Sequence, residues 1–491
     1  MPSEKLESLT GTLVLAILSS GVGSAFHHGY NLGVVNAPQT LLEDFINTTY
    51  TERFGETEAP VTLIYSIFVS VFCVGGMVGG LLTALVAEKL GRKKGLLVNN
   101  VFVFISAALM GFAQRAACYE MLVIGRFVVG INAGLSAGLG PMYLTEISPV
   151  AYRGAVGTIY QLVLTMSILF SQVLGIPQLL GTEDGWPMLF GVPVIPAVLM
   201  LMSLPFCPES PKYLLLVKGQ HDEARRALKR LRATKDIYFE MEVMKSEAET
   251  SEMMPKMTLT EMVRNPALRN PLVISVMVML AQQLSGINAA IFFSTEIFKT
   301  AGMTDDLAVW ATLGMGVVNV VMTIVSMVVV ERAGRRTLLL TGLAGMAVCT
   351  TMLTASMALT SHGQWVSYIS VLGLIGFVVT FAIGPGSIPW FLVNELFGQS
   401  ARSIATSIAV GVNWTANFVV GLAFLPLLTS ETIGHYTFVI FTVILLLFWL
   451  YIYKKLPETK NKTIEEISNM FRVHAYGDEL AMTKLGTKTR R

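Results

Sequence analysis

The chain has 491 residues, of which 53% are apolar and only 14% are charged, and its mean hydropathy is +0.61. Charged residues make up about 25% of an ordinary soluble domain, so this composition excludes a string of soluble domains and favours a membrane protein. The net charge of +2 does not indicate a nucleic-acid partner.

Long uncharged runs recur along the whole sequence, and a membrane helix needs roughly 20 apolar residues. These runs cover residues 8–42, 60–87, 95–114, 154–182, 185–208, 271–295, 307–330, 337–394, 403–430 and 432–453. Residues 337–394 hold two helices that turn near Ser361-His362-Gly363, and residues 121–145 add one that only Arg126 interrupts. The sequence therefore predicts an all-α membrane protein with twelve transmembrane helices, six before Pro208 and six after Arg269.

These helices divide the chain into four predicted segments. A first six-helix bundle covers residues 1–207, a cytoplasmic helical linker 208–269, a second bundle 270–456 and a cytoplasmic tail 457–491. Within the linker, His221–Arg232 is helical in pattern, with acids at its start and arginines later, as the helix dipole favours. We expect the polar tail to be disordered toward Arg491.

The orientation follows from the basic residues, which concentrate on the cytoplasmic side of membrane proteins. With both termini in the cytoplasm, all but four of the 35 Lys and Arg residues lie in cytoplasmic segments. The first apolar run has no basic segment before it and no cleavage site, so we expect a retained helix rather than a signal peptide. These features predict a multi-pass protein of the cell membrane.

Two further sequence patterns concern glycosylation and the state of the cysteines. Asn47-Thr48-Thr49 falls in the loop after the first helix, on the predicted outer face, and makes Asn47 a glycosylation acceptor. The four cysteines lie scattered in or beside apolar helices without metal-ligand spacing, so buried thiols are expected rather than a disulfide framework.

Charged motifs recur in the same order in the two halves. Glu146 and Arg153 return as Glu395 and Arg402, Pro208-Glu209-Ser210 returns as Pro457-Glu458-Thr459, and Gly91-Arg92-Lys93 matches Gly334-Arg335-Arg336. Two similar hydrophobic halves, marked at the same points, indicate a transporter that works by alternating access.

Amide side chains stand inside otherwise apolar helices, where an unpaired amide costs several kcal/mol. They are Gln161, Gln282, Gln283, Asn288, Asn319, Asn413 and Asn417. Any one of them could serve only to hold helices together. The run from Gln282 to Asn288 favours a binding site, because Gly286 permits a local break and transporters place substrate sites at broken helices.

A second break is predicted at Gly384-Pro385-Gly386-Ser387-Ile388-Pro389-Trp390, because two prolines and two glycines disrupt a continuous helix. Amides both donate and accept hydrogen bonds, which suits hydroxyl groups. Trp390 and Trp414 offer flat faces to a sugar ring, and no fixed countercharge stands at mid-membrane. A neutral polyol or sugar is therefore the expected substrate.

The motifs along nearly the whole chain resemble those of the facilitative glucose transporters, sugar porters of the major facilitator superfamily. The residues that carry the resemblance are Gly29-Tyr30-Asn31, Asn36-Ala37-Pro38-Gln39, Gly125-Arg126-Phe127, the 208–214 segment, the 282–288 and 384–391 runs, and Pro457-Glu458-Thr459-Lys460. The resemblance implies the major facilitator fold and sugar contacts at Gln161, Gln282, Gln283, Asn288, Asn319, Trp390 and Asn413.

The resemblance also implies that the repeated charges form a cytoplasmic salt-bridge gate in the outward-facing state. We assign that gate to Arg92, Glu146, Arg153, Glu209, Glu331, Arg335, Arg336, Glu395 and Arg402. Some of these charges could instead serve only as anchors at the membrane surface.

Two positions depart from the glucose-type pattern. Ala382 stands where glucose-type members have a glutamate, and Ser387 replaces a proline. Fructose-type members lack that glutamate but usually also lack the tryptophan, which this chain keeps as Trp390. We therefore expect a facilitative hexose uniporter that carries glucose and also tolerates fructose.

Three alternatives stand beside this expectation. A proton-coupled symporter needs a titratable group in the membrane, but Asn31 replaces the aspartate that the similar symporters carry after Gly-Tyr. A transport-deficient sugar sensor would have a longer tail. A membrane enzyme would need a nucleophile–base pair or a metal cluster, and the adjacent His27 and His28 are better explained as pore-lining or packing residues than as a proton relay. No cofactor, metal or nucleic acid is expected, and the oligomeric state stays open.

Overall fold

The computed structural model describes residues 10–55, 59–149, 153–232, 237–253, 257–460, 462 and 464–476. The first half comprises α1 (Gly11–Gly33), α2 (Gln39–Phe54), α3 (Val61–Lys89), α4 (Arg92–Phe112), α5 (Glu120–Ile147), α6 (Arg153–Leu174), α7 (Trp186–Gly191) and α8 (Val194–Ser203). A connecting segment holds η2 (Leu204–Phe206), α9 (Pro211–Leu216), α10 (His221–Arg232), α11 (Tyr238–Met253) and α12 (Leu259–Arg264).

The second half is also built of helices. It comprises α13 (Pro266–Leu284), α14 (Ile287–Thr300), α15 (Asp305–Arg332), α16 (Arg335–Ala358), η3 (Thr360–His362), α17 (Trp365–Ile383), α18 (Ile388–Leu396), α19 (Gln399–Leu428), η4 (Gly434–Tyr436), α20 (Thr437–Lys455) and the terminal α21 (Ile464–Tyr476).

Among the described residues, ten helical segments are long and apolar enough to cross a membrane. Two further helices complete the predicted twelve: α1, which has 23 residues, and α6, whose apolar part is Thr158–Leu174. Three spans consist of two helical pieces each, namely α7 with α8, α13 with α14, and α17 with α18. The all-helical membrane fold predicted from the sequence is confirmed.

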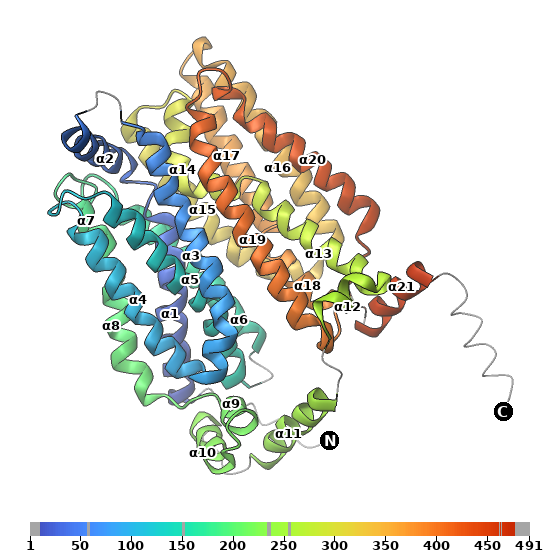
Figure 1. Cartoon of the computed structure of the whole chain (residues 1–491). Coiled ribbons are helices and arrows are strands. Elements are labelled where there is room, and N and C mark those ends of the chain that lie inside the picture. Colours follow the sequence, from blue (N-terminus) through green and yellow to red (C-terminus); the bar gives the residue numbers. More distant parts are fainter. Residues whose placement is uncertain are drawn as a thin grey trace.

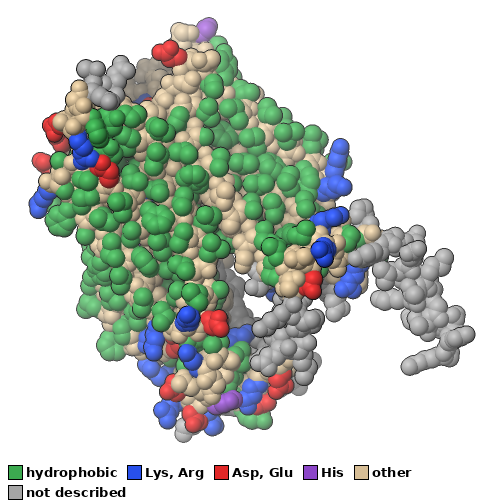
Figure 2. Space-filling model, viewed as in Figure 1, with side chains coloured by type: hydrophobic (Ala, Val, Ile, Leu, Met, Phe, Trp, Pro, Cys, Tyr) green, Lys and Arg blue, Asp and Glu red, His purple; other side chains and the backbone are tan. Residues whose placement is uncertain are grey.

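Figure 1 shows the two groups of helices side by side, with α9, α10 and α11 beneath the first group and α2 at the opposite end. We call these two ends the linker face and the α2 face. Lys and Arg side chains gather on the linker face, whereas hydrophobic side chains cover the flanks (Figure 2). The division of the chain into the four predicted segments remains a prediction.

Glycines allow the closest helix packing in the first half. A Cβ atom on Gly75 or Gly79 of α3 would collide with the backbone of α5, and one on Gly130 or Gly134 of α5 would collide with the backbone of α3. Small residues of this kind permit close approach of membrane helices, where no hydrophobic effect drives the helices together. The contact fixes α3 and α5 as a rigid pair.

Two segments differ from their predicted form. Asn47 is exposed as expected, but it lies on helix α2 and not in a loop. The part of the tail from Ile464 to Tyr476 is a helix, α21, which packs against α13 and α18. Ile467 and Phe471, four residues apart and therefore on one face of α21, are buried and hold it in place.

Candidate functional site

The breaks predicted in two spans are present. Between α13 and α14, Gly286 adopts a φ of +94°, a left-handed conformation that costs glycine nothing sterically. The chain is again non-helical between α17 and α18, where Gly384 has φ −130° and ψ −75°. Each break leaves backbone carbonyls without helical partners, and such groups must be satisfied inside a membrane protein.

Gln282 joins the two breaks. Its side-chain amide donates to the carbonyl oxygens of Pro385 at 2.9 Å and Gly386 at 2.8 Å. Its own oxygen accepts from the side-chain amide of Asn413 on α19 at 2.7 Å. One glutamine thus ties α13, the α17–α18 break and α19 together.

Gln283 extends this network. Its Nε2 donates to Oδ1 of Asn413 at 3.0 Å, and its Oε1 accepts from Nδ2 of Asn288 beyond the Gly286 break. Gln282, Gln283, Asn288 and Asn413 therefore form one buried amide cluster, in which each residue is less than a tenth exposed. The structure brings together four of the seven predicted sugar contacts, with donors and acceptors but no charge.

The other three predicted contacts lie outside this cluster. Gln161 on α6 is exposed, Asn319 on α15 is half-buried, and Trp390 in the first turn of α18 is 40% exposed. Ser387, beside Trp390, has a buried hydroxyl without a hydrogen-bond partner among the described residues. These groups are available to a ligand rather than committed to the protein.

An aromatic contact between the two halves was not predicted. The ring of His28 on α1 stacks on Trp414 of α19 at 5.9 Å, and His28 Nδ1 lies 3.4 Å from the hydroxyl of Tyr160. Gly76 of α3 makes room for the indole, because a Cβ atom there would overlap it. The sequence shows both aromatic residues, but their sequence separation hides the contact. The pore-lining or packing interpretation of His28 agrees with this position.

Polar bonds close the two halves against each other at the α2 face. The side-chain amide of Asn36, in the turn after α1, donates to the carbonyl of Ile291 at 2.9 Å and to the hydroxyl of Ser294 at 2.5 Å. Its oxygen accepts from the backbone amide of Thr295 at 3.1 Å. One side chain of the first half therefore satisfies three groups of α14.

The halves diverge toward the linker face. Gln172 at the end of α6 is 1% exposed and touches the place where a Cβ of Gly316 on α15 would lie. Gln161 lies eleven residues earlier in the same helix, which at 100° per residue puts it on nearly the same face. Because Gln161 is exposed and Gln172 is not, α6 and α15 separate between these two levels, toward the linker face.

The closure at the α2 face should depend on pH. Burial raises the pKa of Glu43 on α2 from 4.5 to about 7, with Glu296 and Asp44 adding repulsion while Gln39 and Lys299 oppose the shift. A carboxyl whose pKa rises on closure favours the closed form when protonated. We expect closure to strengthen as the pH on this side falls through about 7. The distance between spin labels on α2 and α15 measures it, and in Glu43→Gln the response should vanish.

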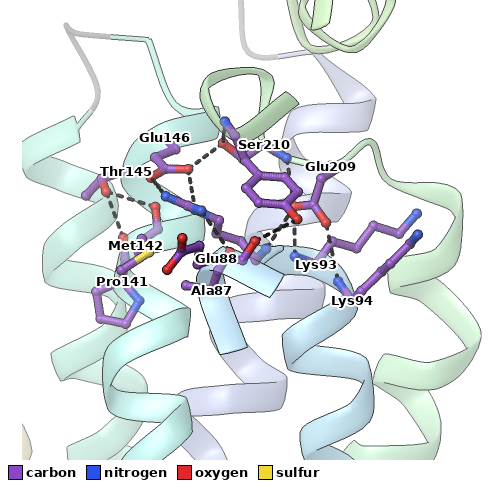
Figure 3. Close-up of polar contacts among 12 residues, drawn as sticks. Ala87, Glu88, Lys93, Lys94, Pro141, Met142, Thr145, Glu146, Glu209 and Ser210 are labelled. Atoms are coloured by element: carbon purple, nitrogen blue, oxygen red, sulfur yellow. Dashed lines mark hydrogen bonds and ion pairs between the residues drawn. The ribbon is translucent and has the colours of Figure 1, made fainter. Parts of the chain in front are cut away.

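The repeated charges form a compact cluster in the first half (Figure 3). Arg92 pairs with Glu146, with its Nε 2.9 Å from Oε2 and its Nη2 2.9 Å from Oε1. Glu209 accepts from the backbone amides of Arg92 at 3.1 Å and Lys93 at 2.9 Å, and Ser210 donates to Glu146. The carboxylate of Glu209 thus caps the first turn of α4, where the helix dipole favours a negative charge.

The second half repeats this arrangement residue for residue. Arg335 Nη2 lies 3.1 Å from Oε1 of Glu395, and Thr459 donates to Oε2 of Glu395 at 2.6 Å. Glu458 accepts from the backbone amides of Arg335 at 2.8 Å and Arg336 at 3.1 Å, and so caps α16. The capping glutamate Glu458 was missing from the predicted gate, although its motif was recognised.

These ion pairs join charges within one half and do not link the two halves. Arg402 donates to the carbonyl of Phe397 at 3.3 Å, and its Nε has no partner among the described residues. Arg153 begins α6 and Glu331 lies in the last turn of α15, but the side chains of both lie outside the described part of the structure. The gate assignment therefore remains a hypothesis about another conformation.

Removing a helix cap should destabilise the second half. Glu458→Ala removes the carboxylate that accepts hydrogen bonds from the first backbone amides of α16 and from the backbone amide of Thr459. The loss of such a helix cap costs about 0.5–2 kcal/mol. We expect a lower melting temperature in detergent. Glu431→Ala, at an exposed position near the α2 face, is the matched control. Equal melting temperatures for both variants would contradict the capping role.

Comparison with known proteins identifies the family to which the chain belongs. Residues 16–471 match the family model "Sugar (and other) transporter". The chain is 44% identical to facilitated glucose transporter member 1 of solute carrier family 2 from Gallus gallus over 471 residues, covering 96% of this chain and 95% of the relative. It is also 44% identical to member 4 from Homo sapiens over 472 residues, covering 95% of this chain and 92% of the relative.

Solved structures of the xylose transporter XylE from E. coli share the fold. The partially occluded inward-open form superposes with a TM-score of 0.77 at 25% identity, over 92% of this chain and 100% of that chain. The inward-open form gives 0.78 at 24% identity, over 93% and 99%. The chain therefore belongs to the sugar transporter family, within the major facilitator superfamily, and is a membrane transporter rather than an enzyme.

Proposed function

We propose that this protein is a facilitative hexose uniporter that carries glucose and also fructose by alternating access. The observation that supports it best is the uncharged amide cluster at the meeting point of two broken spans, Gln282, Gln283, Asn288 and Asn413. Amide donors and acceptors complement sugar hydroxyls, and broken helices are where transporters place their substrates. The named relatives are facilitated glucose transporters, which favours glucose.

We propose that the seven predicted contacts hold the sugar. The amide cluster would exchange its internal bonds for bonds to hydroxyls, while Gln161, Asn319 and Trp390 would add contacts from the open side. In the opposite conformation, the repeated charges would meet across the linker face and hold it shut. That closure would need the partly exposed ion pairs of each half to approach one another without losing their hydrogen bonds.

Proton coupling deserves comparison because similar solved structures include a proton:xylose symporter. Here Asn31 occupies the position of the expected acid, and its side chain donates to the carbonyl of His27 at 2.8 Å. The buried Arg126 donates to the carbonyl of Asn31 at 2.7 Å. A carboxamide has no group that titrates near neutral pH, so Asn31 cannot couple transport to a proton, which favours uniport.

The linker face is proposed to be cytoplasmic and the α2 face external, at the cell membrane. The basic residues of the linker support this orientation. Asn47 would then be glycosylated from outside, since it is exposed on α2. Both termini would lie in the cytoplasm.

The test is uptake of radiolabelled glucose into proteoliposomes that contain the purified full chain, with competition by unlabelled sugars. The proposal expects saturable glucose uptake that fructose inhibits and that neutral sugars of other size inhibit less. Absence of glucose uptake, with a folded protein and another solute carried, would reject the substrate assignment.

Trp390 should select between the two hexoses. Its ring is 40% exposed and offers a stacking face that suits a pyranose. We expect Trp390→Ala to reduce glucose uptake severalfold more than fructose uptake. The measurement is the ratio of the two uptake rates, with Trp310→Ala, another exposed tryptophan, as the control. Equal losses for both sugars would remove Trp390 as the selector.

A further inference from the structure

The amide of Gln172, near the end of α6, is buried without a hydrogen bond. Gln172 is 1% exposed, and neither its Nε2 nor its Oε1 has a partner among the described residues. It is the only described residue with two buried side-chain atoms of this kind. Buried polar groups in folded proteins are nearly always paired, and an unpaired group destabilises the conformation that buries it. The amide of Gln172 therefore weakens the conformation in which it is buried.

The second half of the protein covers this amide. Gly316 on α15 lies directly against it, because a Cβ atom at this glycine would overlap Oε1 of Gln172. Gly316 has no side chain that could donate or accept a hydrogen bond. One turn away on α15, the hydroxyl of Thr312 is already shared with Ser294 and Thr295, at 3.2 and 2.9 Å. The helix α15 thus excludes water from the amide without replacing the hydrogen bonds that water would make.

This destabilisation applies only while the α2 face is closed. Alternating access, on which this inference rests, requires the two halves to separate at the α2 face in the opposite conformation. Gln172 would then be exposed between α6 and α15, as Gln161 is toward the linker face. Water would satisfy both of its polar atoms. The amide is therefore unpaired in one conformation and paired in the other.

Direct contact with the sugar would be another use for a free amide. Gln161, a proposed sugar contact, lies eleven residues earlier in α6, so about 16 Å separate the two positions along the helix axis. One hexose is too small to bridge that distance, and Gly316 of α15 fills the space beside Gln172. The position of Gln172 therefore favours a role in closure over a role in sugar binding.

Closure of the α2 face depends on two opposing contributions. Asn36 makes three hydrogen bonds to α14 that favour the closed form, whereas the unpaired amide of Gln172 opposes it. We propose that Gln172 is a built-in destabilising residue of the closed α2 face. It keeps the closed and open forms close in free energy, so that the empty transporter can reopen. A transporter whose closed form is too stable would rarely return to bind the next sugar.

The distance between spin labels at Asp44 on α2 and Asp306 on α15 tests this proposal. It is measured without sugar in the full chain with Cys118→Ser, in an Asn36→Ala background that weakens closure. Gln172→Leu removes the unpaired amide and keeps a side chain of similar size, so the ratio of closed to open protein should rise about tenfold or more. Gln172→Met should act in the same direction.

Ser171→Ala in the same background is the matched control. The hydroxyl of Ser171 is buried in the same turn of α6, but it already donates to the carbonyl of Ile168 at 2.6 Å. Its removal should leave the distance distribution unchanged. Because no sugar is present, a failure to transport glucose would reject the proposed substrate without affecting this result.

Three results would overturn the proposal. The first is a Gln172→Leu variant that matches the Ser171→Ala control, with a melting temperature that shows it is folded. The second is a shift toward the open form, because it would show that the amide is bonded in the closed form. The third is the absence of any open form in both the wild type and the Asn36→Ala background, since the two forms would then not be close in free energy.

Discussion

Gln282→Ala should weaken glucose binding about tenfold or more. The substitution removes the donor that satisfies the carbonyls of Pro385 and Gly386 and the acceptor that holds Asn413. A sugar that enters this cluster then meets unpaired groups, at roughly 1–3 kcal/mol for each missing bond, and 1.4 kcal/mol is a tenfold change in affinity. The measurement is the dissociation constant for glucose of the purified protein, together with its melting temperature.

The control for this experiment is another buried amide that only joins helices. Asn99 on α4 donates to the carbonyl of Asn132 and to Ser136, both at 3.0 Å, far along the chain from the cluster. Asn99→Ala should lower the melting temperature and leave glucose affinity unchanged. If Gln282→Ala behaves in the same way, the amide cluster is a structural contact and the sugar lies elsewhere.

Asn36→Ala should open the α2 face. Asn36 makes the three bonds that link the turn after α1 to α14, and a bond lost between buried groups costs about 1–3 kcal/mol. Even a loss of about 1.4 kcal/mol lowers the ratio of closed to open protein tenfold. Spin labels at Asp44 on α2 and Asp306 on α15 report the change, in a background where Cys118→Ser removes a partly exposed thiol.

Thr40→Ala is the control variant for this experiment, because Thr40 also lies at the contact between the two halves on the α2 face. Thr40 accepts from Lys299 at 3.3 Å in an exposed position, where such a contact contributes little. Its label distances should stay near those of the wild type. An Asn36 variant with the wild-type distance distribution would show that apolar packing, and not these hydrogen bonds, closes the α2 face.

Local sequence signals accounted for much of the fold. The uncharged runs gave the twelve spans, and the acid-to-base order of His221–Arg232 gave a linker helix with those same bounds. Gly286 and the Gly384–Ser387 run marked the two breaks, because closely spaced glycine and proline among polar residues interrupt the hydrogen bonding of a helix. In each case the decisive residues stand next to one another in the chain.

The two helices that the sequence analysis did not predict, α2 and α21, also have local sequence signals, but weaker ones. In α2, Leu42, Ile46 and Thr49 are buried at helical spacing, and in α21, Ile467 and Phe471 are. Both stretches are amphipathic helices among many polar residues, so composition suggested a loop and a disordered tail. Counting the periodicity would have indicated both helices.

Contacts between residues far apart in the chain could not be predicted from the sequence. Asn36 meets α14 over a separation of more than 250 residues, and His28 meets Trp414 over a longer one. The amide cluster was grouped only in part, because Asn413 joins it through a contact that no local spacing reveals. The repeated charges predicted two equivalent clusters, but the capping role of Glu458 required the structure.

The central claim, facilitated transport without proton coupling, is tested most directly in proteoliposomes with an imposed pH gradient. Asn31 bonds within α1 and cannot carry a proton, so glucose should equilibrate at equal concentrations inside and outside, whichever side is acidic. The final level of radiolabelled glucose is measured with and without a protonophore. Equal levels in all conditions are the predicted result. Accumulation of glucose above the outside concentration, which collapses with the protonophore, would contradict the account.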